Sequence, residues 1–210
     1  EYMTVDAVER TSRPMYPLWD HNLFDAYLRR FGHGRNKKIK DLSRGMQMKL
    51  MLAVALSHDA KLLILDEPTS GLDVLSRDEL MDILSDYVAD GGHSVIFSTH
   101  ITADLERCAD FLTYITHGML YYSGPKDEFE DAYSLVEGGP DELTDGLRRA
   151  MVGIRTYATG FDALVRTQDI PHIGGTNGLL TQHASIEDVI RLTNAAEHTA
   201  IGNTNKGDVR

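Results

Sequence analysis

The sequence predicts an α/β domain whose parallel sheet is flanked by helices. Two short apolar runs, LLILD at 62–66 and SVIFS at 94–98, have the length and residue types of buried strands. Between them, apolar residues recur at helical spacing over 75–90, where Ser76 and Glu79 are expected to form a capping box. A strand, a helix and a second strand within about 35 residues make a βαβ unit, so we expect the two strands to be parallel.

The first 40 residues are polar and have a helical pattern that is interrupted by Pro14 and Pro17. A loose apolar stripe follows these prolines and ends at Gly32 and Gly34. A stronger helix is predicted over 42–58. Ser43 caps it, and apolar residues lie nearly all round it, so we expect it to be buried. Its methionines are expected in the core: Met46, Met48 and Met51.

The part of the chain after the second strand is less regular. A short helix at 103–109 precedes two strands, FLTYIT and MLYYS, that flank a predicted hairpin turn at His117-Gly118. The pattern loosens beyond Ala132. We expect helices over 141–151 and 161–166, a strand over 154–158, a loop at Gly174-Gly175, a helix over 186–196 capped by Ser185, and disorder in the tail after Ala200.

The composition is that of a folded protein: of 210 residues, 42% are hydrophobic and 25% are charged, which excludes collagen-like and largely disordered classes. The net charge of −11 opposes binding to nucleic acid or anionic lipid, so we expect no nucleic-acid partner. The single cysteine, Cys108, excludes an internal disulfide framework. No apolar run reaches the length of about 18 residues that spans a membrane.

Polar side chains follow both predicted strands. Asp66 and Glu67 end the first strand, and Thr99 and His100 end the second. The carboxyl ends of parallel strands meet at one crevice, where α/β proteins bind ligands. Nucleotide hydrolysis needs this arrangement: Asp66 would hold Mg²⁺, Glu67 would activate the attacking water, and His100 would bond the terminal phosphate. The alternative for the acids is a strand end entering a solvated turn, and for the histidine a structural role.

The start of the buried helix is a second candidate site. Ser43, Arg44 and Gly45 combine a hydroxyl, a cation and a residue without a side chain, and helix N-termini bind anions through their free amides. The alternative is an ordinary helix cap.

Three segments resemble the motifs of the ABC-transporter ATPase family in order and spacing. DLSRGMQMKL resembles its signature, LLILDEPTSGLD its Walker B motif and D-loop, and FSTHI its switch histidine. The segments WDHNLF, LRRF, DLERCADFLTYITHGMLYYSG and SIEDVI resemble the bacitracin- and acetoin-type exporter ATPases within this family. The resemblance implies the fold of the C-terminal part of a P-loop ABC ATPase domain, with part of its helical subdomain and a small C-terminal extension.

The resemblance also implies residue roles. Ser43 and Gly45 would bind the terminal phosphate of an ATP held by a second subunit, and Asp66 would bind Mg²⁺ through water. Glu67 would be the catalytic base and His100 the switch histidine. The D-loop at the seam of a head-to-tail dimer would consist of Ser70, Gly71, Leu72 and Asp73.

Two features depart from the family pattern. Arg44 and Met46 replace the first Gly and the Gln of the usual LSGGQ signature. None of the 18 glycines is followed by Lys, so the sequence contains no Walker A loop, whose amides and Lys hold the phosphates. The chain also begins with Glu1 rather than Met, so we expect it to be a piece of a longer protein and inactive alone.

The expected organisation is the remainder of the helical subdomain at 1–40, the ATPase core at 41–132, an accessory region at 133–200 and a tail at 201–210. The expected function is ATP hydrolysis coupled to export, with membrane-spanning subunits and a second ATPase subunit as partners, at the cytoplasmic face of the membrane. The alternatives are a soluble ABC ATPase that acts on nucleic acid or ribosomes, and a non-catalytic fragment that binds a partner.

Overall fold

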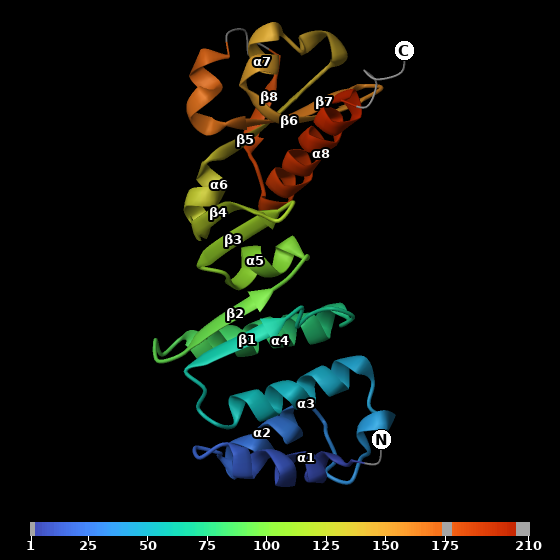
Figure 1. Ribbon diagram of the computed structural model, residues 1–210, viewed down its shortest axis with the longest axis vertical. Helices are drawn as coiled ribbons and strands as arrows, with labels where there is room; N and C mark the ends of the chain where they lie inside the picture. The colour runs from blue at the N-terminus through green and yellow to red at the C-terminus, as the bar shows by residue number, and fades with distance from the viewer. Residues whose placement is uncertain (1–2, 174–177, 205–210) are drawn as a thin grey trace. The chain divides into compact units, whose positions relative to one another are not determined.

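The computed structural model describes residues 3–173 and 178–204, with side chains described up to residue 195. The chain forms two compact units, Glu1–Cys108 and Ala109–Arg210 (Figure 1). Within the described residues, no helix combines the length and the apolar character that crossing a membrane requires.

The first unit begins with three helices, each started by a polar side chain that accepts a backbone N–H. Thr4 caps α1 (Val5–Ser12), Asp20 caps α2 (His21–Arg30), and Ser43 caps α3 (Arg44–Leu56) as predicted. Such caps satisfy amides that the first helical turn leaves unpaired. Two 3₁₀ turns separate the helices: η1 (Arg13–Met15), which contains Pro14, and η2 (Ile39–Asp41).

The predicted βαβ unit follows. Strand β1 (Leu62–Asp66) pairs with β2 (Ser94–Ser98) in parallel, which confirms the prediction, and α4 (Val74–Val88) connects them. Helix α5 (Thr102–Cys108) comes next. The predicted capping box at the start of α4 is wrong: the cap is Asp73, which accepts from the amide of Ser76 at 2.9 Å.

The two faces of the β1–β2 pair differ in burial. Leu63 lies in the core with α4, whereas Leu62, Ile64 and Ile96 are 47%, 74% and 58% exposed on the alternate positions. Helix α3 is also only partly buried. Met51 is 65% exposed, so its predicted place in the core is wrong, and Met46 and Met48 are half-buried.

The second unit begins with the predicted hairpin of β3 (Phe111–Thr116) and β4 (Met119–Pro125). His117 and Gly118 connect the strands with φ angles of 49° and 74°, the left-handed conformation that two-residue hairpin turns require. The prediction of a turn at this dipeptide is therefore confirmed.

A four-stranded antiparallel sheet completes the second unit, in the order β6-β7-β5-β8. Its strands are β5 (Tyr133–Gly138), β6 (Met151–Tyr157), β7 (Gly160–Arg166) and β8 (Leu180–His183). Helices α6 (Lys126–Asp131), α7 (Asp145–Ala150) and α8 (Ile186–Thr204), with the 3₁₀ turns η3 (Pro140–Glu142) and η4 (Thr167–His172), surround it. The order of elements resembles a βαββαβ plan.

This region contains the main errors of the sequence analysis. The helix predicted over 161–166 is strand β7, and strands β5 and β8 were not predicted at all. Because β7 is central in its sheet and is buried at six of seven positions, its sequence lacks the polar alternation that marks a half-exposed strand. Helix α8 continues past the predicted start of the tail, and the predicted loop at Gly174-Gly175 and residues 205–210 lie outside the described residues.

Candidate functional site

The parallel pairing of β1 and β2 places Asp66 opposite Ser98 at the carboxyl ends of the strands. The Ser98 hydroxyl donates to Asp66 Oδ1 at 2.5 Å and accepts the amide of Glu67 at 2.9 Å. The Asp66 carboxylate is exposed to solvent. One serine side chain therefore orients two consecutive acidic residues.

Glu67 and His100 meet at the same strand ends. Glu67 Oε2 lies 2.7 Å from His100 Nδ1, and the two side chains are 35% and 71% exposed. Glu67 has a φ of 46°, and its carbonyl accepts the amide of Ser70 at 3.1 Å, so the chain turns sharply after the acid. The structure thus brings the predicted acid and imidazole together, with both accessible to a ligand.

The second predicted site lies at the start of α3. The Ser43 hydroxyl accepts the amide of Met46 at 3.2 Å, and the Ser43 carbonyl accepts the amide of Gln47 at 2.9 Å. Ser43 and Arg44 are exposed. The N-terminal end of a 13-residue helix, where partial positive charge collects, therefore faces solvent beside a cationic side chain.

The turn at 70–73 packs against this helix end. Gly71 has a φ of 75°, and a Cβ there would lie 3.3 Å from the Cδ atom of Arg44. A Cβ on Gly45 would lie 3.1 Å from a methyl carbon of Leu72. A side chain at either glycine would therefore require its neighbour to move, and at Gly71 the positive φ also favours glycine.

These segments line a pocket of about 450 Å³. Its lining combines cationic, acidic, small polar and apolar residues: Phe31, Ser43, Arg44, Gly45, Met46, Lys49, Gly71, Leu72, Asp73 and Ser76. Asp73 accepts hydrogen bonds from the amide and the hydroxyl of Ser76, which hold the pKa of its carboxyl below its usual value. The predicted residues thus form two clusters, one in this pocket and one at the strand ends, and the segment 67–73 connects them.

The described residues contain no cluster of three or more His, Cys, Asp or Glu side chains suited to a metal ion. Mg²⁺ needs no such cluster, because it is commonly held by one or two carboxylates, several waters and substrate phosphates. The exposed carboxylate of Asp66, oriented by Ser98, fits that donor set.

Comparisons with known proteins identify the family of the chain. Residues 2–103 match the family described as "AAA domain, putative AbiEii toxin, Type IV TA system". The chain is 46% identical over 92 residues to the human retinal-specific phospholipid-transporting ATPase ABCA4, covering 44% of this chain and 4% of that protein. It is 33% identical over 171 residues to Nod factor export ATP-binding protein I of Neorhizobium galegae, covering 74% of this chain and 48% of that protein.

A solved structure of the ATP-binding subunit of an ABC transporter superposes with a TM-score of 0.55 at 27% identity, over 61% of this chain and 55% of that one. The chain contains the C-terminal part of an ABC ATPase domain. The family resemblance and the fold class expected from its sequence motifs are thereby confirmed. The chain spans about half or less of the length of the two curated relatives.

Three polar residues of this ABC ATPase domain were missed in the sequence analysis: Ser98, Thr69 and Asp104. Ser98 ends β2, and the side chains of Thr69 and Asp104 are buried and bonded to each other at 2.7 Å. A hydroxyl at the last position of an apolar strand was a usable signal for Ser98. The sequence contains no comparable signal for Asp104, because acidic residues are common in the first turn of a helix.

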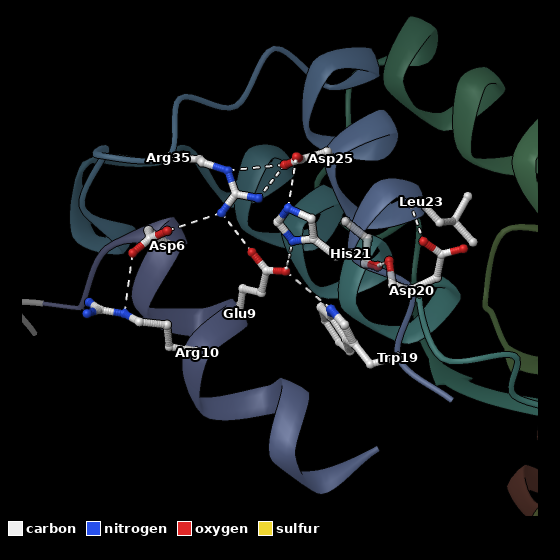
Figure 2. Close-up of polar contacts among 11 residues, drawn as sticks. Asp6, Glu9, Arg10, Trp19, Asp20, His21, Leu23, Asp25 and Arg35 are labelled. Atoms are coloured by element: carbon white, nitrogen blue, oxygen red, sulfur yellow. Dashed lines mark hydrogen bonds and ion pairs between the residues drawn. The ribbon is translucent and has the colours of Figure 1, made fainter. Parts of the chain in front are cut away.

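The helical part of the domain contains a network centred on Arg35 (Figure 2). The guanidinium donates to Glu9 at 2.7 Å and Asp6 at 3.1 Å on α1, and forms a close ion pair with Asp25 on α2. Glu9 is 5% exposed and also accepts from the Trp19 indole at 3.2 Å. Arg35 therefore links the two helices and the loop that precedes α3.

Burial alone would raise the pKa of Glu9, but hydrogen bonds from His21, Arg35 and Trp19 outweigh it, so the pKa lies below its ordinary value. A carboxyl with a lowered folded-state pKa stabilises the fold above its unfolded-state pKa. That contribution is lost as the pH falls through the folded-state value.

Replacing Arg35 by Met is expected to lower the free energy of unfolding by about 3 kcal/mol, because the buried Glu9 carboxylate loses the guanidinium that contacts it at 2.7 Å. The stability of the variant should also depend less on pH in the acidic range. Urea unfolding followed by fluorescence of Trp19, the only tryptophan, measures both effects. Arg29→Met, an exposed change on α2, is the matched control and should stay within about 0.5 kcal/mol of the wild type. Equal effects of the two changes would contradict the assigned role of the network.

Proposed function

We propose that this chain is part of the ATP-binding and ATP-hydrolysing subunit of an ABC transporter of the export type. The observation that carries the proposal is the 2.7 Å contact between Glu67 and His100 beside the Asp66 carboxylate at the ends of two parallel strands. The names of two relatives support this proposal. One is a phospholipid-transporting ATPase, which supports ATP hydrolysis, and the other is an export ATP-binding protein, which supports export as the direction of transport.

In the proposed reaction, Glu67 accepts a proton from the water that attacks the terminal phosphate of ATP. His100 orients the Glu67 carboxylate and donates to a phosphate oxygen. Asp66 would hold Mg²⁺ through water, and a bound Mg²⁺ would supply positive charge beside the phosphates. The exposure of Glu67 and His100 leaves room for a nucleotide to reach both.

Ser43 and Gly45 are proposed to act on the ATP of a second subunit in a head-to-tail dimer. Their helix end is exposed and carries the positive end of the α3 dipole, which suits the terminal phosphate of a nucleotide. The turn from Ser70 through Asp73 lies between this helix end and Glu67. A second subunit that contacts this turn is therefore expected to change the position of the proposed catalytic base.

The proposed partners are membrane-spanning transporter subunits and the second ATPase subunit, at the cytoplasmic face of the membrane. The net charge of −11 supports the absence of a nucleic-acid partner. The transported substrate is expected to contact the membrane subunits, so the residues of this chain do not identify it.

Nucleotide binding tests the proposal. The 210-residue chain contains no Walker A sequence and is expected to bind Mg-ATP no more tightly than millimolar in calorimetry. The complete protein, which is proposed to contain that loop, should bind it at micromolar concentration and hydrolyse it. Micromolar binding by the chain alone would show that phosphate is held by other residues, and absence of hydrolysis by the complete protein would refute the proposed function.

A further inference from the structure

A buried carboxylate lies behind the proposed catalytic pair and takes no part in the reaction described above. Asp104, in helix α5, is 1% exposed. A buried charge is costly unless other groups bond to it, so its partners identify what it stabilises.

Two of the partners of Asp104 come from the loops that follow β1 and β2. Asp104 Oδ2 accepts the hydroxyl of Thr69 at 2.7 Å and that of Thr99 at 3.4 Å. The Thr99 hydroxyl in turn accepts the amide of Ile101 at 3.0 Å, which leaves its own proton for Asp104. The third partner is Arg77 on α4, whose Nε lies 3.8 Å from Asp104 Oδ1.

The positions of the two threonines connect this cluster to the catalytic pair. Thr69 follows Glu67 by two residues and is itself 1% exposed, and Thr99 directly precedes His100. One buried carboxylate therefore holds both loops, each within two residues of a proposed catalytic side chain.

The contact between Glu67 and His100 is not buried from solvent as the Asp104 cluster is. Both side chains are partly or largely exposed, and exposed ion pairs are weak because solvent screens them. The pair is thus poorly suited to fix its own distance, whereas the buried cluster behind it is well suited to do so.

We propose that Asp104 is a positioning residue that sets the distance between Glu67 and His100 through Thr69 and Thr99. The expected effect of Asp104 on catalysis rests on the proposed function. The expected effect of Asp104 on the distance between Glu67 and His100 does not depend on that function.

The geometric part is tested on the 210-residue chain by NMR of the imidazole Cε1–Hε1 signals. The signal of His100 among the nine histidines is assigned by its loss in His100→Ala. Glu67→Gln should shift this signal, and both Asp104→Asn and Thr69→Val should shift it in the same direction. Glu106→Gln, which removes a charge from an exposed position of the same helix, should leave it in place.

The catalytic part is tested in the complete protein. Asp104→Asn should lower kcat by about 10²-fold, the scale of a misplaced catalytic group, and change KM for ATP by less than about twofold. In a His100→Ala background the same change should lower kcat by less than about threefold further, because the contact that it positions is already lost. A purely structural role would lower the folded fraction equally in both backgrounds.

The inference would be overturned if the His100 signal of a folded Asp104→Asn chain does not shift. It would also be overturned if the effects of Asp104→Asn and His100→Ala on kcat are fully additive. If Asp104→Asn does not fold, Thr69→Val, which removes only a hydroxyl at nearly constant shape, decides in its place. Normal turnover by Glu67→Gln would instead refute the catalytic assignment of the proposed function, and the NMR result would still decide the positioning role.

Discussion

Replacing Glu67 by Gln is expected to reduce ATP turnover by the complete protein by about 10²–10⁴-fold, the usual contribution of a general base. The amide is nearly isosteric with the carboxylate but does not accept a proton from water. The side chain is reached from solvent and contacts His100 at 2.7 Å, so the change removes basicity without removing a buried support. Binding of Mg-ATP should be unchanged, because the base acts on water in the transition state.

Single-turnover hydrolysis and calorimetry with Mg-ATP separate these two effects. Glu106→Gln, the same chemical change at an exposed position of α5, is the control and should hydrolyse ATP at the wild-type rate. A Glu67→Gln protein that hydrolyses ATP nearly as fast as the wild type would transfer the role of base to another group, first of all His100.

Gly45→Asp is expected to abolish ATP-driven dimerisation of the complete protein while leaving nucleotide binding to the monomer nearly unchanged. A carboxylate at the start of α3 would face the phosphates of the partner's ATP, and like charges placed together at an interface cost enough to weaken association by about 10²-fold or more. The monomer should still bind ATP, because the proposed action of Gly45 is on the other subunit.

Sedimentation with ATP, in a Glu67→Gln background that preserves the nucleotide, measures this effect. Gly45→Ala isolates the steric part, since a Cβ there would lie 3.1 Å from Leu72. Gly34→Asp adds the same charge where a Cβ meets no atom within 4 Å and should dimerise normally. If Gly45→Asp dimerises like Gly34→Asp, or loses monomer binding instead, the signature does not act across a dimer.

The elements of the first unit were predictable because local signals agreed with tertiary packing. The run at 62–66 and the run at 94–98 became parallel strands, and Ser43 capped the helix that follows it. The run at 161–166 was mistaken for a helix because a strand buried on both faces has no alternation to distinguish it from a buried helix. Its pairing with β5 and β6 decided its conformation, and its paired residues in β5 lie up to 33 residues away in sequence.

The candidate site likewise has a part that the sequence predicted and a part that only the tertiary structure shows. The sequence by itself predicted the candidate catalytic residues, since Asp66, Glu67 and His100 stand where parallel strands end, and parallel pairing brings strand ends together. Only the tertiary structure decided how these groups are held. Asp104 bonds Thr69 from 35 residues away, and Arg44 covers Gly71 from the start of another helix. Neither contact follows from local periodicity or motif spacing, because each depends on how separate helices and loops pack in three dimensions.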